Sequence, residues 1–118
     1  MNIAANIATA LVALLHLWFL VMEMFLWDKP YGRRAFGLTP EFAAASKTLA
    51  ANQGLYNGFL AAGLAWGLLL GAEGNAIKVF FLVCVIIAGV FGATTASRKI
   101  LYVQALPGAV ALALLWLA

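Results

Sequence analysis

Polar side chains interrupt two long apolar runs of this chain, and they are the residues best suited to chemistry. A buried ionisable or amide group needs a partner, because leaving it unpaired in an apolar environment costs free energy. We therefore treat these residues as candidate site residues. The first run contains His16 and Glu23, and the second contains Asn52, Gln53, Tyr56 and Asn57.

Glu23 is the first candidate for a catalytic role, with His16 as the second. An intramembrane carboxyl group can act as a general acid, a proton carrier or the partner of a cation. The alternative is a structural carboxylate near the membrane surface, paired with Arg33, Arg34 or Lys99. His16 lies ~10.5 Å from Glu23 along a helix axis, so the two side chains could meet only through water or a ligand. A histidine that locks helices together is an equal alternative.

The amide side chains suit the binding of a ligand. On a helix the four polar residues of the second run fall within an arc of ~140°. They could hydrogen-bond a ligand, or they could bind one another across helices as structural contacts. The ligand-binding candidates are Asn52, Gln53, Tyr56, Asn57, Gln104 and Trp27.

Neither a metal nor any other cofactor is expected. One histidine and one glutamate do not form a metal site without further ligands. Cys84 is the single cysteine and lies in an apolar run, so it indicates neither a disulfide nor a metal centre.

The composition indicates an integral membrane protein. Of the 118 residues 66% are hydrophobic and 9% are charged, and the mean hydropathy is +1.03. Such a chain has too few charges to cover a water-facing surface of its size. The net charge of +3 does not indicate nucleic acid as a partner, because the chain has no basic stripe with interleaved aromatic residues.

Four apolar runs are long enough to cross a hydrocarbon core of ~30 Å as helices. We expect one all-α domain, residues 1–118, that forms a bundle of four transmembrane helices. The predicted spans are residues 3–27, 49–71, 76–96 and 100–118.

Local signals refine these helices. Thr39, Pro40 and Glu41 read as a helix start, with a hydroxyl cap, a proline in the first turn and a carboxylate near the positive helix end. The second helix would then exceed the thickness of the membrane core, with its first residues at the headgroups or in water. Pro107 predicts a kink in the fourth helix.

The basic residues predict the orientation. The second connection has only Lys78, so the other two connections are expected to be cytoplasmic and both termini outside. The basic residues beside the first and third connections are Lys29, Arg33, Arg34, Lys47, Arg98 and Lys99.

With this orientation the candidate residues share the cytoplasmic half of the membrane. We predict a polar pocket open to the cytoplasm, with Glu23 at its mouth and His16 at its deep end. Small residues four apart, such as Gly54 and Gly58, would let helices approach closely. Gly63 leaves room below the polar groups for an apolar part of a ligand.

Three segments of the chain resemble the bacterial membrane family catalogued as domain of unknown function 1304. The resemblance covers essentially the whole chain and implies a small inner-membrane protein of four helices without an established activity. It therefore carries over no catalytic residue. The segments are EMFLW (residues 23–27), GRRAFGLTPEF (residues 32–42) and AANQGLYNGFLAAGL (residues 50–64).

The first functional hypothesis is the binding of a small amphiphilic or lipid-like molecule, with acid/base chemistry at Glu23 if the protein is an enzyme. One alternative is a proton-coupled transporter of small molecules that uses Glu23. Small multidrug transporters have this size, but their basic residues are nearly balanced across the membrane, unlike those here. Another alternative is an accessory structural subunit. Membrane lipid is the expected partner, and the sequence leaves open whether the chain forms a homo-oligomer.

Overall fold

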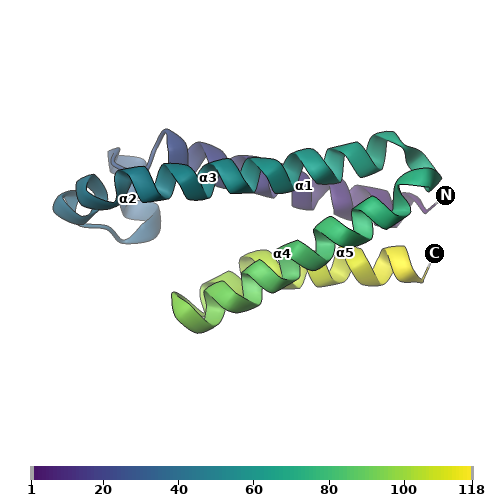
Figure 1. The fold of residues 1–118 in the computed structure, drawn as a ribbon. Coiled ribbons are helices and arrows are strands. Elements are labelled where there is room, and N and C mark those ends of the chain that lie inside the picture. The colour runs from purple at the N-terminus through teal and green to yellow at the C-terminus, as the bar shows by residue number, and fades with distance from the viewer. Residues whose placement is uncertain (1, 118) are drawn as a thin grey trace. The chain divides into compact units, whose positions relative to one another are not determined.

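The computed structural model describes residues 2–117, which form helices joined by short turns (Figure 1). No strand occurs in this part of the chain, so the all-α prediction is confirmed. The elements are α1 (Ile3–Met24), α2 (Pro30–Phe36), α3 (Pro40–Leu69), the 3₁₀ helix η1 (Gly71–Gly74), α4 (Asn75–Thr95), the π-helical turn η2 (Leu101–Ala105) and α5 (Leu106–Trp116).

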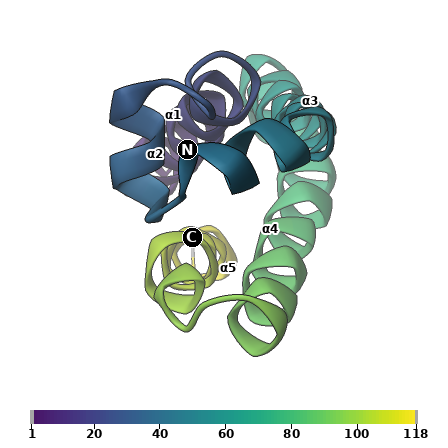
Figure 2. The same ribbon diagram turned by 90° about the vertical axis from the view of Figure 1, so that its left-hand side faces the viewer.

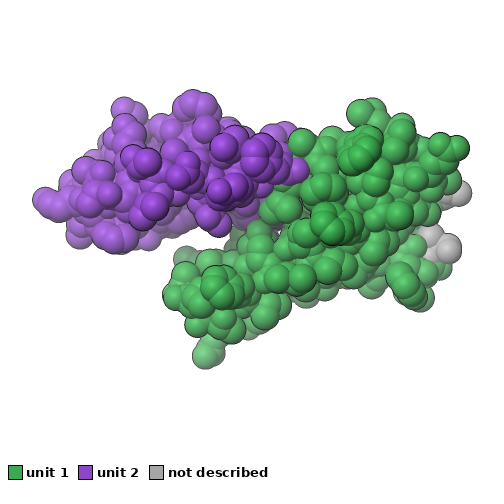
Figure 3. All heavy atoms as spheres, viewed as in Figure 1, with its two compact units in different colours: residues 1–14, 60–118 green, residues 15–59 purple. Residues whose placement is uncertain are grey.

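The chain divides into two compact units, which have different colours in Figure 3. Unit 2 is the segment Leu15–Phe59, and unit 1 contains the chain up to Leu14 and from Leu60 onward. Helices α1 and α3 therefore each contribute residues to both units.

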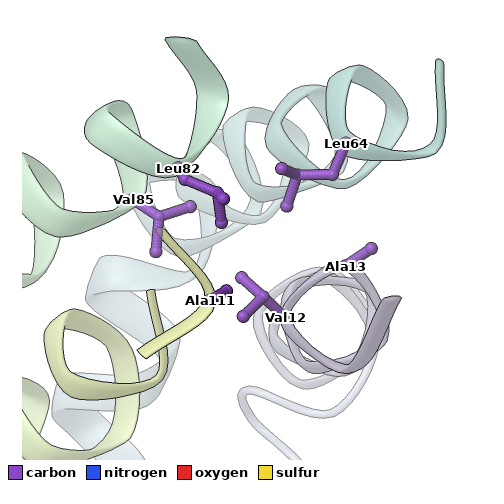
Figure 4. Close-up of a cluster of buried hydrophobic side chains, with 6 residues drawn as sticks. All are labelled: Val12, Ala13, Leu64, Leu82, Val85 and Ala111. Atoms are coloured by element: carbon purple, nitrogen blue, oxygen red, sulfur yellow. The ribbon is translucent and has the colours of Figure 1, made fainter. Parts of the chain in front are cut away.

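The core of unit 1 is a cluster of small and branched apolar side chains from four helices (Figure 4). Leu64, Leu82 and Val85 are fully buried within it. Helices α4 and α5 lie side by side in Figures 1 and 2. The cluster consists of Val12, Ala13, Leu64, Leu82, Val85 and Ala111.

A π-helical turn, η2, lies just before Pro107, where the sequence predicts a kink. Proline has no N–H, so Pro107 cannot donate to the carbonyl of Val103 as a helical residue would. Just before it, the N–H of Leu106 donates to the carbonyl of Leu101, five residues back. One wider, π-helical turn thus accommodates the hydrogen bond that Pro107 cannot donate, and α5 continues as a regular helix after it.

The helix start predicted at Thr39 and Pro40 is confirmed, and this helix ends at Leu69. Helix α3 begins at Pro40, and the hydroxyl oxygen of Thr39 accepts a hydrogen bond from the N–H of Phe42 at 3.1 Å. At its other end Gly71 has a φ of 63°, which favours glycine because a side chain would be strained there. The short connection predicted after Gly71 is the 3₁₀ helix η1.

The first helix is shorter than the span predicted over residues 3–27, and the span itself stays a prediction. Helix α1 ends at Met24, and a further helix, α2, follows it. Pro30 is the first residue of α2, where proline suits a helix. Gly32 lies so close to the carbonyl of Leu26 that a Cβ would overlap it. This contact lets α2 fold back directly onto the end of the first helical segment.

Two helical stretches among the described residues are long and apolar enough to cross a membrane, Ile3–Met24 and Gly71–Thr95. The stretch Leu101–Trp116 is apolar but shorter. Helix α3 is long, but its amide residues lower its hydropathy. Large apolar side chains are exposed along one stripe of α1 at Ile3, Ile7, Leu11 and Leu14, as expected for a surface that contacts lipid.

The contact between α4 and η2 yields a stability prediction. A Cβ at Gly89 would lie 2.5 Å from the nitrogen and 2.8 Å from the Cα of Ala105. We expect Gly89→Ala to lower the free energy of unfolding in detergent by ~1–3 kcal/mol, because backbone must move to admit the methyl group. The thermal unfolding midpoint measures this. Val90→Leu, at the exposed neighbouring position, serves as the control, and equal midpoints for both variants would contradict the contact.

Candidate functional site

Glu23 and Asn57 are joined by a hydrogen bond within unit 2. The amide nitrogen Nδ2 of Asn57 donates to Oε1 of Glu23 at 2.5 Å. Glu23 lies in the last turn of α1 and is half-buried, whereas Asn57 lies in the middle of α3 and is 7% exposed. A hydrogen bond that involves a carboxylate is stronger than one between neutral groups. The polar residues of the first apolar run and those of the second therefore meet through Glu23 and Asn57.

Glycines allow α3 to approach α1 closely at this pair. A Cβ at Gly54 would lie 2.7 Å from Cγ of Met24 and 3.2 Å from the carbonyl oxygen of Leu20. A Cβ at Gly58 would lie 2.8 Å from Cδ1 of Leu20. The close approach predicted from the spacing of these two glycines is thus confirmed. Asn57 lies on the same face of α3, and the glycines bring its amide within reach of Glu23.

The other polar residues of α3 do not join this contact. Asn52, Gln53 and Tyr56 are exposed, and Asn52 lies on the side of the helix opposite to the glycines. The ring of Tyr56 contacts that of Phe59, with centroids 6.0 Å apart. The sequence placed all four polar residues in one arc, but close packing through small residues decides which one reaches α1. Ligand binding by the exposed three stays a prediction.

Trp27 is held against the start of α3. Its indole Nε1 donates to the hydroxyl oxygen of Ser46 at 3.0 Å, and that hydroxyl donates to the carbonyl of Phe42 at 2.7 Å. The Trp27 ring also contacts that of Phe36, with centroids 4.9 Å apart. Ser46 was not among the sequence candidates, because a single serine in an alanine-rich helix gives little signal. A ligand-binding role for Trp27 stays a prediction.

An ion pair lies beside this contact. Nζ of Lys47 lies 3.2 Å from Oδ2 of Asp28. The hydrogen bond from Lys47 holds the pKa of the Asp28 carboxyl below its ordinary value. Since Lys47 is exposed, we expect this pair to contribute little to stability. It does, however, connect the turn after α1 to the first turns of α3.

The two remaining candidates, His16 and Gln104, belong to α1 and η2. His16 is completely buried in α1, and its ring packs edge-on against Phe19, with centroids 5.2 Å apart. It is seven residues from Glu23 on the same helix, so a direct hydrogen bond is out of reach. Gln104 is half-buried in η2 of unit 1. Within residues 2–117 no three His, Cys, Asp or Glu side chains gather as metal ligands.

The comparisons with known proteins agree in assigning no activity. Residues 10–116 match the family model described as "Protein of unknown function (DUF1304)". The uncharacterized protein YpaA of Lactococcus lactis subsp. lactis strain IL1403 is 30% identical over 106 residues, which cover 88% of this chain and 89% of that protein. No solved structure gave a significant match.

The Glu23–Asn57 pair predicts a coupling that a double-mutant cycle can measure. We expect Glu23→Leu and Asn57→Leu to interact by ~0.5–2 kcal/mol in the free energy of unfolding, because each variant removes the same hydrogen bond. Thermal or denaturant unfolding in detergent supplies the four values. Glu41→Leu combined with Asn57→Leu is the matched control, since Glu41 is exposed and lies sixteen residues earlier on α3. If the double variant lost as much stability as the two single variants together, the Glu23–Asn57 contact would be contradicted.

Proposed function

The chain belongs to the DUF1304 family, and since that family has no assigned activity, we propose a function from the Glu23–Asn57 pair. The protein is a bacterial inner-membrane protein of one domain with four spans. It binds a small amphiphilic or lipid-like molecule at the cytoplasmic ends of α1 and α3. Glu23 and Asn57 form the polar centre of this site, and any acid/base chemistry belongs to Glu23.

The observation that carries the proposal is the hydrogen bond from Asn57 to Glu23. A carboxyl group in an apolar helix is expensive and is therefore a candidate for function. Asn57 binds Oε1, which orients the carboxyl group, and in this proposal Oε2 accepts a hydrogen bond from a donor on the ligand. A hydroxyl or ammonium group is such a donor, and both are common in lipid headgroups.

The exposed face of α3 supports an amphiphilic ligand. Helix α3 has 30 residues, or ~45 Å of helix, which exceeds a membrane core of ~30 Å. If its C-terminal part spans the core, Asn52 and Gln53 lie at headgroup level. The next turn exposes Leu55 and Phe59. Amide groups followed by apolar groups suit a headgroup with an attached chain better than a bare ion.

The distribution of basic residues supports the orientation. Lys78 adjoins the second connection, in the first turn of α4. The first and third connections are flanked by Lys29, Arg33, Arg34, Lys47, Arg98 and Lys99. Both termini then lie outside the cytoplasm.

Ligand binding can be tested by co-purification. The wild-type protein, purified in mild detergent, is expected to retain an amphiphile that mass spectrometry of an organic extract detects. Glu23→Gln is expected to lose most of it, because the amide cannot accept hydrogen bonds as a carboxylate does. Glu73→Gln is the matched control, since Glu73 is exposed in η1.

An empty wild-type protein, or equal recovery from Glu23→Gln, would contradict the binding proposal. Proton-driven solute flux in vesicles that is lost in Glu23→Gln, together with an empty purified protein, would favour the transporter instead.

The orientation predicts where fused reporters are active. A reporter that works only outside the cytoplasm is expected to be active after Ala118 and inactive when inserted after Gly37, in the connection between α2 and α3. The matched reporter that works only in the cytoplasm should give the reverse pattern. Activity of the cytoplasmic reporter after Ala118 would show that the proposed site faces the other side.

A further inference from the structure

Lys78 is a buried cation in unit 1 that the site at Glu23 does not use. It lies in the first turn of α4 and is 3% exposed. Its Nζ donates to Oδ1 of Asn6, in α1, at 3.4 Å. This distance is long for a hydrogen bond from an ammonium group. The neutral amide of Asn6 therefore meets only part of the hydrogen-bonding capacity of the Lys78 ammonium group.

Two glycines fix the course of the Lys78 side chain. A Cβ at Gly67 would lie 2.6 Å from Cγ of Lys78 and 3.1 Å from its backbone nitrogen. A Cβ at Gly74 would overlap the backbone of Gly67. The end of α3 and the start of α4 therefore touch through glycine backbone, and the apolar stem of Lys78 lies over Gly67. The ammonium group is thus held at Asn6 by packing.

The charge of Lys78 has no protein counterion among residues 2–117. The ion pair found there joins Lys47 to Asp28 in unit 2, and Glu73, the nearest carboxylate in sequence, is exposed. A buried ammonium group needs compensation, because its desolvation costs several kcal/mol. It has three N–H donors, of which Asn6 accepts one.

A cavity of about 690 Å³ adjoins Lys78. Asn6 and Asn75 line it beside Lys78, and Ile3 and Leu115 supply apolar wall. The start of α1, the end of α5 and the η1 turn meet at this end of unit 1 (Figure 1). The volume lies within the range of ~300–1,000 Å³ typical of ligand sites.

Asn2 is the fourth polar residue that lines the cavity, and its side chain makes two hydrogen bonds there. Oδ1 of Asn2 accepts a hydrogen bond from the N–H of Ala5 at 3.0 Å, and its Nδ2 donates to the carbonyl of Leu114 at 3.2 Å. Asn2 thus joins the start of α1 to the last turn of α5. The remaining polar groups, on Asn6, Asn75 and Lys78, are the ones placed to receive a ligand.

We propose that this cavity binds an oxyanion of the phosphate class, held by the ammonium group of Lys78 and the side-chain amides of Asn6 and Asn75. A phosphate oxygen accepts charge-assisted hydrogen bonds from such donors, and it supplies a negative charge that Lys78 does not find among residues 2–117. A phospholipid headgroup and free inorganic phosphate share this chemistry. The apolar wall of Ile3 and Leu115 would in addition contact an acyl chain. The proposal does not depend on the site at Glu23.

Two probes distinguish the sources of the anion. The full chain in a nonionic detergent is titrated with short-chain phosphatidylglycerol, with the matching diacylglycerol as a control that lacks phosphate. A second series uses inorganic phosphate against chloride at equal ionic strength. The shift of the thermal unfolding midpoint gives the apparent affinity. Binding of the phospholipid alone assigns the site to a headgroup, and binding of inorganic phosphate assigns it to a free anion.

Substitutions at Lys78 test the role of the charge. Lys78→Met keeps the apolar stem over Gly67 and is expected to weaken binding of the responding probe about tenfold or more, because a charge-assisted hydrogen bond is lost. Lys78→Arg is expected to retain most of the affinity. Lys99→Met is the matched control, since Lys99 is exposed, and it should bind as the wild type does.

A substitution at Asn6 tests the same idea without removing the lysine. Asn6→Asp places a carboxylate where the amide oxygen now lies near Nζ, so it supplies the missing negative charge from within the protein. We expect a higher unfolding midpoint without any probe and at least a tenfold loss of affinity for the probe. Unchanged affinity in Asn6→Asp or in Lys78→Met would overturn the proposal, as would a wild-type protein that responds to neither probe.

Discussion

The contacts at Glu23 and Lys78 follow from one constraint: a polar side chain left without a partner in an apolar helix costs free energy. At Glu23 the partner is Asn57. That contact exists only because Gly54 and Gly58 let the backbone of α3 approach α1. The glycines and the amide therefore act together, and a side chain at either glycine would separate the carboxyl group from its donor.

Unit 1 obeys the same constraint at Lys78, with a different outcome. Gly67 and Gly74 again supply a close backbone contact, and Asn6 again supplies an amide partner. In both pairs the amide offers the charged group a dipole and no opposite charge. The amide of Asn57 lies 2.5 Å from the Glu23 oxygen, whereas the amide oxygen of Asn6 lies 3.4 Å from Nζ of Lys78, which adjoins a cavity.

The sequence predicts elements well where the signal is local. The Thr39 cap, the turn at Gly71 and the disturbance at Pro107 follow from the chemistry of single residues, and all three are found. Helix α2 was missed because it depends on the close approach of Gly32 to the carbonyl of Leu26, which residue types alone do not show. Asn52 and Asn57 could not be separated by helical periodicity alone, since only packing shows which face of α3 approaches α1. Lys78 was read as a loop charge because its burial arises from contacts with distant segments.

Chemical labelling of Glu23 tests the central claim most directly. An apolar carbodiimide reacts with carboxyl groups inside membranes, and peptide mass spectrometry gives the extent of reaction at each residue. The account predicts that Glu23 is labelled in protein stripped of its amphiphile by prolonged washing with detergent, and that adding back the total lipid extract of the expressing cells protects it several-fold. Labelling at exposed Glu41 should not change. Equal labelling of Glu23 with and without the extract would contradict a ligand site at the Glu23–Asn57 pair.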